Sequence, residues 1–194
     1  MHMSGPVPEG VHGDAPQPPA DAATAAAVRS GLQPRVSFVD QLQAQGLRVS
    51  LDAVMPFAHW VTPAIEIRRY DTRFLMARVP WDQEGSHDAG ETTALEWMTP
   101  SDAIARCWGG EIMLPPPTWA TLRRLARFGS IDEAWHWACT TPIVRIEPGF
   151  LRDGERSLLM LPGDPTYPRP DGCEPFEDTR FELVDGGGWR PVSA

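Results

Sequence analysis

A stretch between residues 68 and 79 has the hydrophobic and polar periodicity of a half-buried strand. From Arg69 to Phe74 every second position is charged, and the positions between them are Tyr70, Thr72 and Phe74. A period of two places alternate side chains on opposite faces, so one face can enter a core. The other face presents two guanidinium groups and a carboxylate. The pattern therefore predicts a strand over residues 68–79.

Four helices are predicted from residues that begin helices well, namely serine, threonine and a proline in the first turn. They are Ser37 to Ala44 with Gly46 as the stop, Thr99 to Cys107, Thr118 to Phe128 ended by Gly129, and Ser130 to Cys139. The last two are separated by a short turn only. We expect them to form a C-terminal αα-hairpin.

The remaining elements are short strands and turns. Strands are predicted at Leu51 to Val61, Thr92 to Met98, Arg145 to Ile146, Ser157 to Leu161 and Phe181 to Val184. Pro56 within the first of them indicates an edge or a bulge. Mixed helices and strands predict an α/β or α+β fold. We expect a disordered Pro/Ala-rich tail over residues 1–34, one domain over 35–168 and a turn-rich extension over 169–194.

Composition narrows the class of protein. The chain has 194 residues, 42% of them hydrophobic, which fits one soluble domain with tails. No apolar run approaches the ~20 residues of a membrane helix, and the N-terminus lacks the features of a secretory signal. A cytoplasmic location without membrane association is expected. Three widely spaced cysteines predict neither a disulfide framework nor a zinc site.

The net charge and the absence of lysine exclude further classes of function. A net charge of −9 argues against nucleic-acid binding. All 17 basic residues are arginine, so neither a Schiff-base lysine nor a phosphate-loop lysine is available.

Three arginines on or beside the charged strand are candidate ligands for phosphate. Arg68, Arg69 and Arg73 carry planar guanidinium groups that suit bidentate recognition of phosphate or carboxylate. The competing interpretation is a solvated face, with these arginines paired to Asp71 and Glu66. The periodicity alone leaves both interpretations open.

Six short motifs occur in order along the chain. They are Trp60-Val-Thr-Pro63, Arg68-Arg-Tyr-Asp-Thr-Arg-Phe74, Gly90-Glu-Thr92, Glu96-Trp-Met-Thr-Pro100, Leu114-Pro-Pro-Pro-Thr118 and Leu161-Pro-Gly-Asp-Pro165. Together they resemble the C-terminal two thirds of a Nudix hydrolase domain. The similar branch comprises the mitochondrial and peroxisomal coenzyme A diphosphatases and their bacterial relatives. The resemblance covers about residues 35–168.

The resemblance implies a fold and an activity. The fold would be an incomplete α/β/α sandwich around a mixed sheet. The activity would be hydrolysis of a nucleoside diphosphate linked to another group such as coenzyme A, with Mg²⁺ or Mn²⁺. Carboxylates hold such ions, which polarise a phosphoryl oxygen and lower the pKa of an attacking water. In the family these carboxylates come mainly from the Nudix box, a helix carrying Arg-Glu-x-x-x-Glu-Glu.

The chain departs from the family at that box. Every glutamate stands alone, and no Arg-Glu dipeptide occurs. By resemblance, Glu91 in the loop after the charged strand is the one candidate metal ligand or catalytic base. The alternative for Glu91 is an ordinary loop acid, and a lone carboxylate binds Mg²⁺ poorly.

Two functions from different classes therefore stay open. In the first, the chain is a Nudix-like hydrolase without its catalytic part, inactive alone. Its exposed sheet edges would pair with a second copy or with a partner chain that completes the sheet. In the second, it is a non-catalytic module that binds a phosphorylated small molecule or assembles with another protein.

Overall fold

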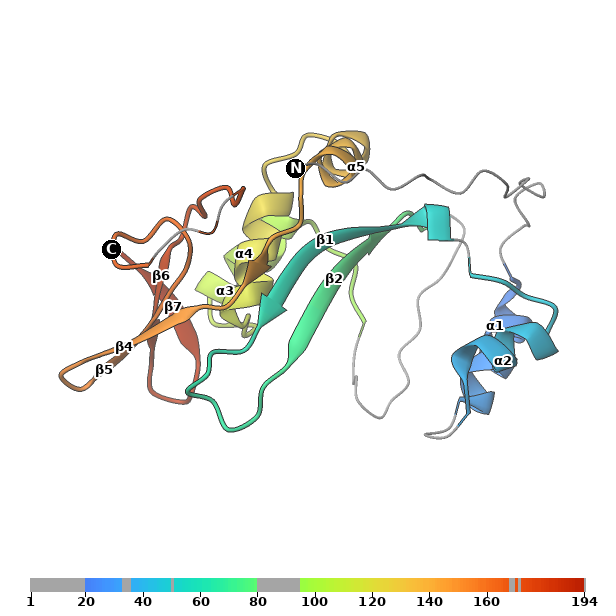
Figure 1. Ribbon diagram of the computed structural model, residues 1–194, viewed down its shortest axis with the longest axis horizontal. Coiled ribbons are helices and arrows are strands. Elements are labelled where there is room, and N and C mark those ends of the chain that lie inside the picture. The colour runs from blue at the N-terminus through green and yellow to red at the C-terminus, as the bar shows by residue number, and fades with distance from the viewer. Residues whose placement is uncertain are drawn as a thin grey trace, which may run out of the picture. The chain divides into compact units, whose positions relative to one another are not determined.

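The computed structural model describes residues 20–32, 36–49, 51–79, 95–167, 170 and 172–193. The chain divides into two compact units, Met1–Asp52 and Ala53–Ala194, called here the helical unit and the main unit. Helices and strands are both present, so the predicted α+β class is confirmed (Figure 1). Within the described residues, every helix is too short or too polar to span a lipid bilayer.

The helical unit contains α1 (Ala22–Gly31) and α2 (Phe38–Ala44), which contact one another. The Ser37 hydroxyl accepts a hydrogen bond from the Asp40 amide at 3.4 Å, so the predicted cap of α2 is confirmed. Gly46 follows α2 with a φ of 68°, a left-handed conformation that favours glycine and ends the helix. The predicted tail over 1–34 lies mostly outside the described residues and stays a prediction.

A three-stranded mixed sheet forms one part of the main unit. It contains β1 (Val54–Val61), β2 (Asp71–Ala77) and β3 (Arg145–Ile146), in the order β2-β1-β3. β1 is antiparallel to β2 and parallel to β3. The register of β1 against β2 shifts between Pro56 and Ala58, so the bulge predicted from Pro56 is confirmed. A short 3₁₀ turn, Leu51–Ala53, precedes β1.

A second, antiparallel sheet has the order β4-β5-β6-β7. Its strands are β4 (Gly149–Asp153), β5 (Arg156–Met160), β6 (Arg180–Leu183) and β7 (Trp189–Val192). A turn at Asp153-Gly154 joins β4 to β5, and Gly154 has a φ of 60°. Buried Asp164 pairs with Arg180 at the start of β6, at 2.8 Å.

Three helices complete the main unit: α3 (Pro100–Trp108), α4 (Pro116–Leu125) and α5 (Ile131–Thr140). Thr99 and Ser130 cap α3 and α5 through their side chains, as predicted. α4 and α5 follow one another along the chain, as expected for the predicted αα-hairpin. In the fold, however, α4 packs mainly against α3, and α5 packs against β1.

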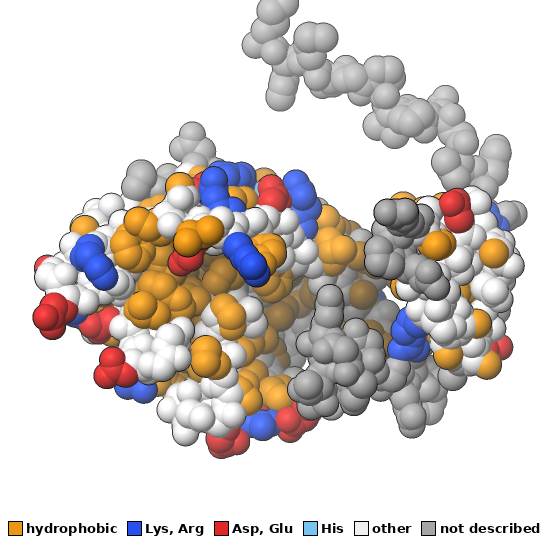
Figure 2. Space-filling model, turned by 90° about the horizontal axis from the view of Figure 1, so that it is seen from below, with side chains coloured by type: hydrophobic (Ala, Val, Ile, Leu, Met, Phe, Trp, Pro, Cys, Tyr) orange, Lys and Arg blue, Asp and Glu red, His pale blue; other side chains and the backbone are white. Residues whose placement is uncertain are grey.

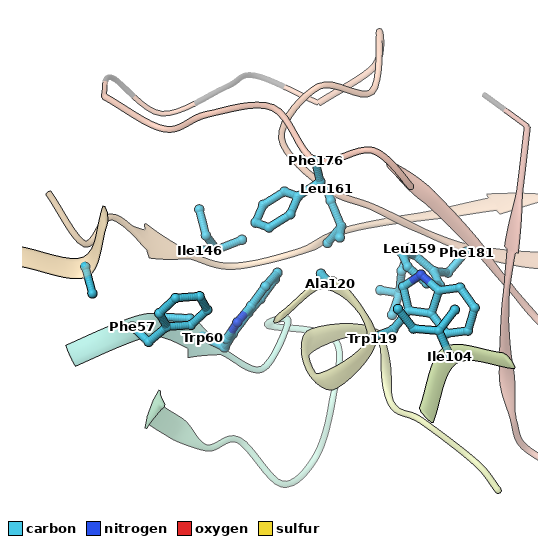
Figure 3. Close-up of a cluster of buried hydrophobic side chains, with 12 residues drawn as sticks. Phe57, Trp60, Ile104, Trp119, Ala120, Ile146, Leu159, Leu161, Phe176 and Phe181 are labelled. Carbon is cyan, nitrogen blue, oxygen red and sulfur yellow. The ribbon is translucent and has the colours of Figure 1, made fainter. Parts of the chain in front are cut away.

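Aromatic side chains dominate the core of the main unit. Phe57, Trp60, Trp119, Phe176 and Phe181 are each at least nine-tenths buried. Figure 3 shows Trp60 rising from β1 toward Ile146 and Phe176, while Trp119 of α4 lies beside Leu159 and Ile104. One cluster thus joins the mixed sheet, the antiparallel sheet and the helices α3, α4 and α5. Burying such large rings supplies most of the packing energy of a small domain.

Several predicted boundaries need correction. The strand expected over Thr92 to Met98 is absent from its described part, residues 95–98, where Glu96 pairs with Arg106 of α3 at 2.6 Å. α4 begins at Pro116 instead of after Thr118, because two prolines occupy its first positions. β4 and β7 were not predicted. The charged strand is shorter than predicted, since residues 68–70 belong to the loop before β2.

Candidate functional site

The loop between β1 and β2 carries the predicted arginines and is closed at its base by Thr62 and Tyr70. The Thr62 amide donates to the Tyr70 carbonyl at 2.9 Å, and the Tyr70 amide donates to the Thr62 hydroxyl at 3.0 Å. Within the loop, the Glu66 amide donates to the Pro63 carbonyl at 3.1 Å. These bonds fix the two ends of the loop and leave its tip in solvent, where Ile65 and Ile67 are exposed.

Arg69 is engaged by the fold itself. Its Nε donates to the Thr62 carbonyl at 3.0 Å, and a terminal nitrogen donates to the Glu147 carboxylate at 2.8 Å. Arg145 donates to the other oxygen of Glu147, also at 2.8 Å. Arg69 therefore ties the β1–β2 loop to the end of β3, a structural contact that leaves it less available to a ligand.

Arg73 on β2 is also paired. It lies 3.3 Å from Asp71, whose carboxylate in addition contacts His59 of β1 at 2.8 Å. The hydrogen bond with His59, followed by the charge of Arg73, lowers the pKa of Asp71 below its usual value. Arg73 thus lies on the solvated, internally paired face that was one of the two interpretations of the sequence. Within the described residues, Glu66 forms no ion pair with Arg68, Arg69 or Arg73.

Arg68 differs from its two neighbours. In the described part of the chain it makes no hydrogen bond or ion pair, and it lines a hollow of about 420 Å³. We call this the Trp60–Trp189 hollow; its other walls include Val61, Phe74, Pro148 and Leu159. It lies between the mixed sheet, the antiparallel sheet and the start of α4. Of the arginines described, Arg68 alone lines it.

The start of α4 forms a rigid, donor-poor wall of the hollow. Pro115, Pro116 and Pro117 all line it. Proline has no N–H, so this helix start lacks two of the free amide donors that usually make a helix N-terminus attractive to anions. Arg68 is the one positively charged side chain among the described residues that line the hollow, and its other polar side chains are Thr62, Glu66, Tyr70, Thr72 and Thr118.

Hydrophobic side chains form a broad area on the surface seen in Figure 2, with single charged side chains standing among them. Exposed apolar side chains of the β1–β2 region include Tyr70 at 63% and Leu75 at 61% of their surface. A broad apolar area on a protein surface is typical of a binding or assembly site.

The described side chains do not fit a Mg²⁺ or Mn²⁺ ion. They contain no group of three or more His, Cys, Asp and Glu residues placed to hold a metal. Glu91, the predicted metal ligand or base, lies outside the described residues, so its role stays a prediction. Asp164, the most buried acid of the described part, is fully engaged by Arg180 and Thr166.

Parts of the hollow were not anticipated from the sequence. Trp189 is the first residue of β7 and comes directly after three glycines, and Pro148 lies between β3 and β4. Neither residue stands in a pattern that marks a site. A tryptophan in a stretch otherwise rich in glycine was the only available signal.

Comparison with known proteins finds three relatives that share one name. The chain is 28% identical over 142 residues to "Acyl-coenzyme A diphosphatase NUDT19" of Xenopus laevis, covering 69% of this chain and 37% of the relative. The Gallus gallus protein of that name is 31% identical over 176 residues, which cover 82% of this chain and 46% of the relative. The Homo sapiens protein is 29% identical over 120 residues, which cover 59% of this chain and 32% of the relative.

The chain thus spans between about a third and a half of the length of these relatives. No family model matches it, and no solved structure matches it. The relatives nevertheless agree with the resemblance carried by the six motifs. This chain is a distant relative of the acyl-coenzyme A diphosphatases of the Nudix family.

Proposed function

We propose that the main unit binds a nucleoside-diphosphate compound of the coenzyme A type in the Trp60–Trp189 hollow, with Arg68 contacting a phosphate. The observation that carries this proposal is an arginine without a protein partner at an apolar hollow of about 420 Å³. That volume lies within the range of small-molecule sites. The hollow offers what such a ligand requires, namely apolar walls for its uncharged parts and a guanidinium group for its phosphates.

The relatives support the class of ligand. They are named acyl-coenzyme A diphosphatases, and an acyl-coenzyme A combines an apolar acyl group with several phosphates. Arg69 and Arg73 would then support the loop and the strand, and Arg68 alone would contact the ligand. The family activity of this chain would be metal-dependent hydrolysis of the diphosphate.

We further propose that the 194 residues alone do not hydrolyse the ligand. The sequence holds no Glu-Glu pair, and the described residues hold no cluster of metal-binding side chains. A hydrolytic site of this family would therefore require carboxylates beyond those described.

Calorimetry on the full 194-residue chain tests the binding proposal. Coenzyme A and ADP-ribose are titrated into the unmodified chain, Arg68→Ala and the control Arg73→Ala. We expect Arg68→Ala to raise the Kd roughly tenfold, the equivalent of ~1.4 kcal/mol, because a charge-assisted hydrogen bond to phosphate is lost. Arg73→Ala should change the Kd less than about twofold, since Arg73 already pairs with Asp71. Equal effects of both variants, or no heat with either ligand, would reject the hollow as the site.

The same samples test the absence of hydrolysis. Phosphorus NMR with coenzyme A and Mg²⁺ or Mn²⁺ should detect no new phosphomonoester. Turnover by the purified chain that disappears in Glu91→Gln would contradict this part of the proposal and would assign Glu91 a catalytic role.

A second candidate function is protein assembly, and the edge of the mixed sheet favours it. β2 is at the end of the strand order, so its outer edge has no strand partner within the described residues. Leu75 at its centre is 61% exposed. An uncovered apolar edge invites pairing with a further strand. Here we propose that a second copy of this chain, or a partner chain, supplies that strand.

Sedimentation velocity over a range of protein concentrations tests assembly. The unmodified chain should associate as concentration rises, and Leu75→Lys should remain monomeric, because edge lysines oppose strand pairing. Arg152→Lys on β4 serves as the matched control and should associate normally. A sedimentation coefficient independent of concentration would reject self-association.

A further inference from the structure

A second, smaller cavity lies in the main unit and shares Trp60 with the Trp60–Trp189 hollow. Its walls include Phe57, Trp60, Arg124, Trp137, Ile146 and Phe176. About 20 Å³ is open to the centre of a water molecule. That space holds one or two particles of the size of a water molecule, since about 10–15 Å³ suffices for one. We call it the Trp60–Trp137 cavity.

Two tryptophans that line the cavity each have an indole N–H group without a hydrogen-bond partner. Nε1 of Trp60 and Nε1 of Trp137 are both buried and unsatisfied. They are the two buried side-chain groups of the described residues left in this state. Buried N–H groups almost always find an acceptor, so two orphans on the walls of one cavity point to an acceptor inside it. Figure 3 shows the indole ring of Trp60 near Phe57 and Phe176.

Arg124 brings a third donor and a positive charge to the same cavity. Its guanidinium carbon lies 5.1 Å from the centre of the Trp137 ring and 4.6 Å from that of Phe176. Within the described residues it makes no hydrogen bond or ion pair. The rings hold its position, and its N–H groups remain available. Burial lowers the pKa of Arg124, which indicates an incompletely compensated charge.

The acidic and titratable neighbours of the cavity are already engaged. Glu174 lines the cavity and lies 3.3 Å from Arg127, while His59 contacts Asp71 at 2.8 Å. The Cys173 thiol donates to the Glu174 carbonyl at 3.3 Å. A water molecule accepts only about two hydrogen bonds and must also donate its own. An anion can accept from all three donor groups and compensates the charge of Arg124.

We propose that the Trp60–Trp137 cavity binds one small anion of the size of chloride or bromide, held by Arg124 and the indole N–H groups of Trp60 and Trp137. The aromatic walls favour a weakly hydrated anion, because such an ion loses less hydration on entry. The site joins β1, α4 and α5. It is independent of the function proposed above.

Bromide titration of the full chain, followed through the indole N–H signals by nitrogen–proton NMR, tests the proposal. Ionic strength is held constant with sodium sulfate, whose anion is larger than bromide. The chain has eight tryptophans, so eight indole signals serve as mutual references. We expect the Trp60 and Trp137 signals to shift and saturate together. Trp137→Phe, which keeps an aromatic ring, assigns one of them.

Arg124→Gln and a matched control decide the outcome. Arg124→Gln should weaken bromide binding at least tenfold. Arg123→Gln, on the same helix but outside the cavity walls, should change it less than twofold. Shifts that do not saturate, that affect all indole signals alike, or that persist unchanged in Arg124→Gln would overturn the anion site.

Discussion

The antiparallel sheet and the β1–β2 hairpin differ in that the hairpin carries an arginine without an ion-pair partner among the described residues, whereas Arg156 and Arg180 of the sheet are paired. At the antiparallel sheet, Arg180 holds buried Asp164 through two hydrogen bonds of 2.8 and 3.0 Å. Arg156 holds Glu182 on the neighbouring strand through two more, of 2.6 and 3.0 Å. At the hairpin, by contrast, Arg68 has no partner within the described residues.

The difference separates charges that hold the fold together from a charge that is available to a ligand. A buried or bidentate pair restrains two elements, so removing one partner destabilises the protein. An exposed arginine without a partner contributes little to stability. Measurements of unfolding free energy and of ligand binding, on variants of both kinds of residue, test this contrast.

The largest effect is expected for Asp164→Asn. The substitution leaves the Arg180 guanidinium without its buried counter-charge, and we expect the free energy of unfolding to fall by about 3 kcal/mol. Urea denaturation measures it. Glu182→Gln is the control, because Arg156 is half exposed and the expected loss is below about 1 kcal/mol. A loss in the control as large as that in Asp164→Asn would remove the distinction between buried and exposed pairs.

A pH dependence of stability should follow from the same carboxylate. Burial alone would raise the pKa of Asp164, but hydrogen bonds from Arg180 and Thr166 prevail and lower the pKa from 3.8 to about 2. A folded-state pKa below the unfolded one stabilises the protein above the unfolded value. This contribution, about 2 kcal/mol, is lost as the pH falls from 3.8 to about 2. Urea midpoints over this range should show the loss in the unmodified chain and not in Asp164→Asn.

An intermediate effect is expected at the junction of the two sheets. The Tyr167 hydroxyl donates to the Glu147 carbonyl at 2.6 Å, between β3 and β4. Tyr167→Phe keeps the ring and should lower the free energy of unfolding by about 1 kcal/mol through the lost hydrogen bond. Thermal unfolding measures it, with Tyr70→Phe, an exposed residue of the hairpin, as the matched control. Equal shifts in both variants would show that the junction contributes nothing particular.

The smallest stability effect, paired with the largest binding effect, is expected at Arg68. Arg69→Ala should lower the free energy of unfolding by about 1 kcal/mol, because Arg69 contacts Thr62 and Glu147, whereas Arg68→Ala should change it by less than about 0.5 kcal/mol. The order should reverse for coenzyme A binding. The two measurements together, on adjacent residues, separate a structural arginine from a ligand-binding one. A larger stability loss in Arg68→Ala would contradict this division.

Local signals made much of the fold predictable. Ser37, Thr99 and Ser130 each accept a hydrogen bond from an amide of the first turn, as cap residues should. Pro56 marked the bulge in β1 because a proline cannot donate to a strand ladder. Such signals depend on a few adjacent residues, so a single sequence suffices to read them.

Elements that depend on distant contacts could not be predicted. β7 contains Pro191 and follows three glycines, so its own residues favour a turn, and pairing with β6 makes it a strand. Threonine is a common N-cap residue, so Thr118 was expected to precede the helix, but the prolines before it already begin α4. Tertiary pairing overrides local preference in both places.

The candidate site was predictable only in outline. The sequence indicated the three arginines around the charged strand but gave no means to rank them. Glu147, which engages Arg69, is 78 residues away along the chain. Trp189 reaches the hollow from a different sheet. Only the folded arrangement distinguishes Arg68 from its neighbours.

The prolines at the start of α4 have a consequence for the entropy of binding. Each proline ring fixes its own φ angle, so Pro115 to Pro117 have few alternative conformations even in the unfolded chain. The wall that they form beside the hollow is therefore ordered before any ligand arrives. A ligand that contacts this wall loses less affinity to loop ordering than one bound by a flexible segment. Tight binding would then require only a small number of polar contacts, which is what a hollow with a single arginine provides.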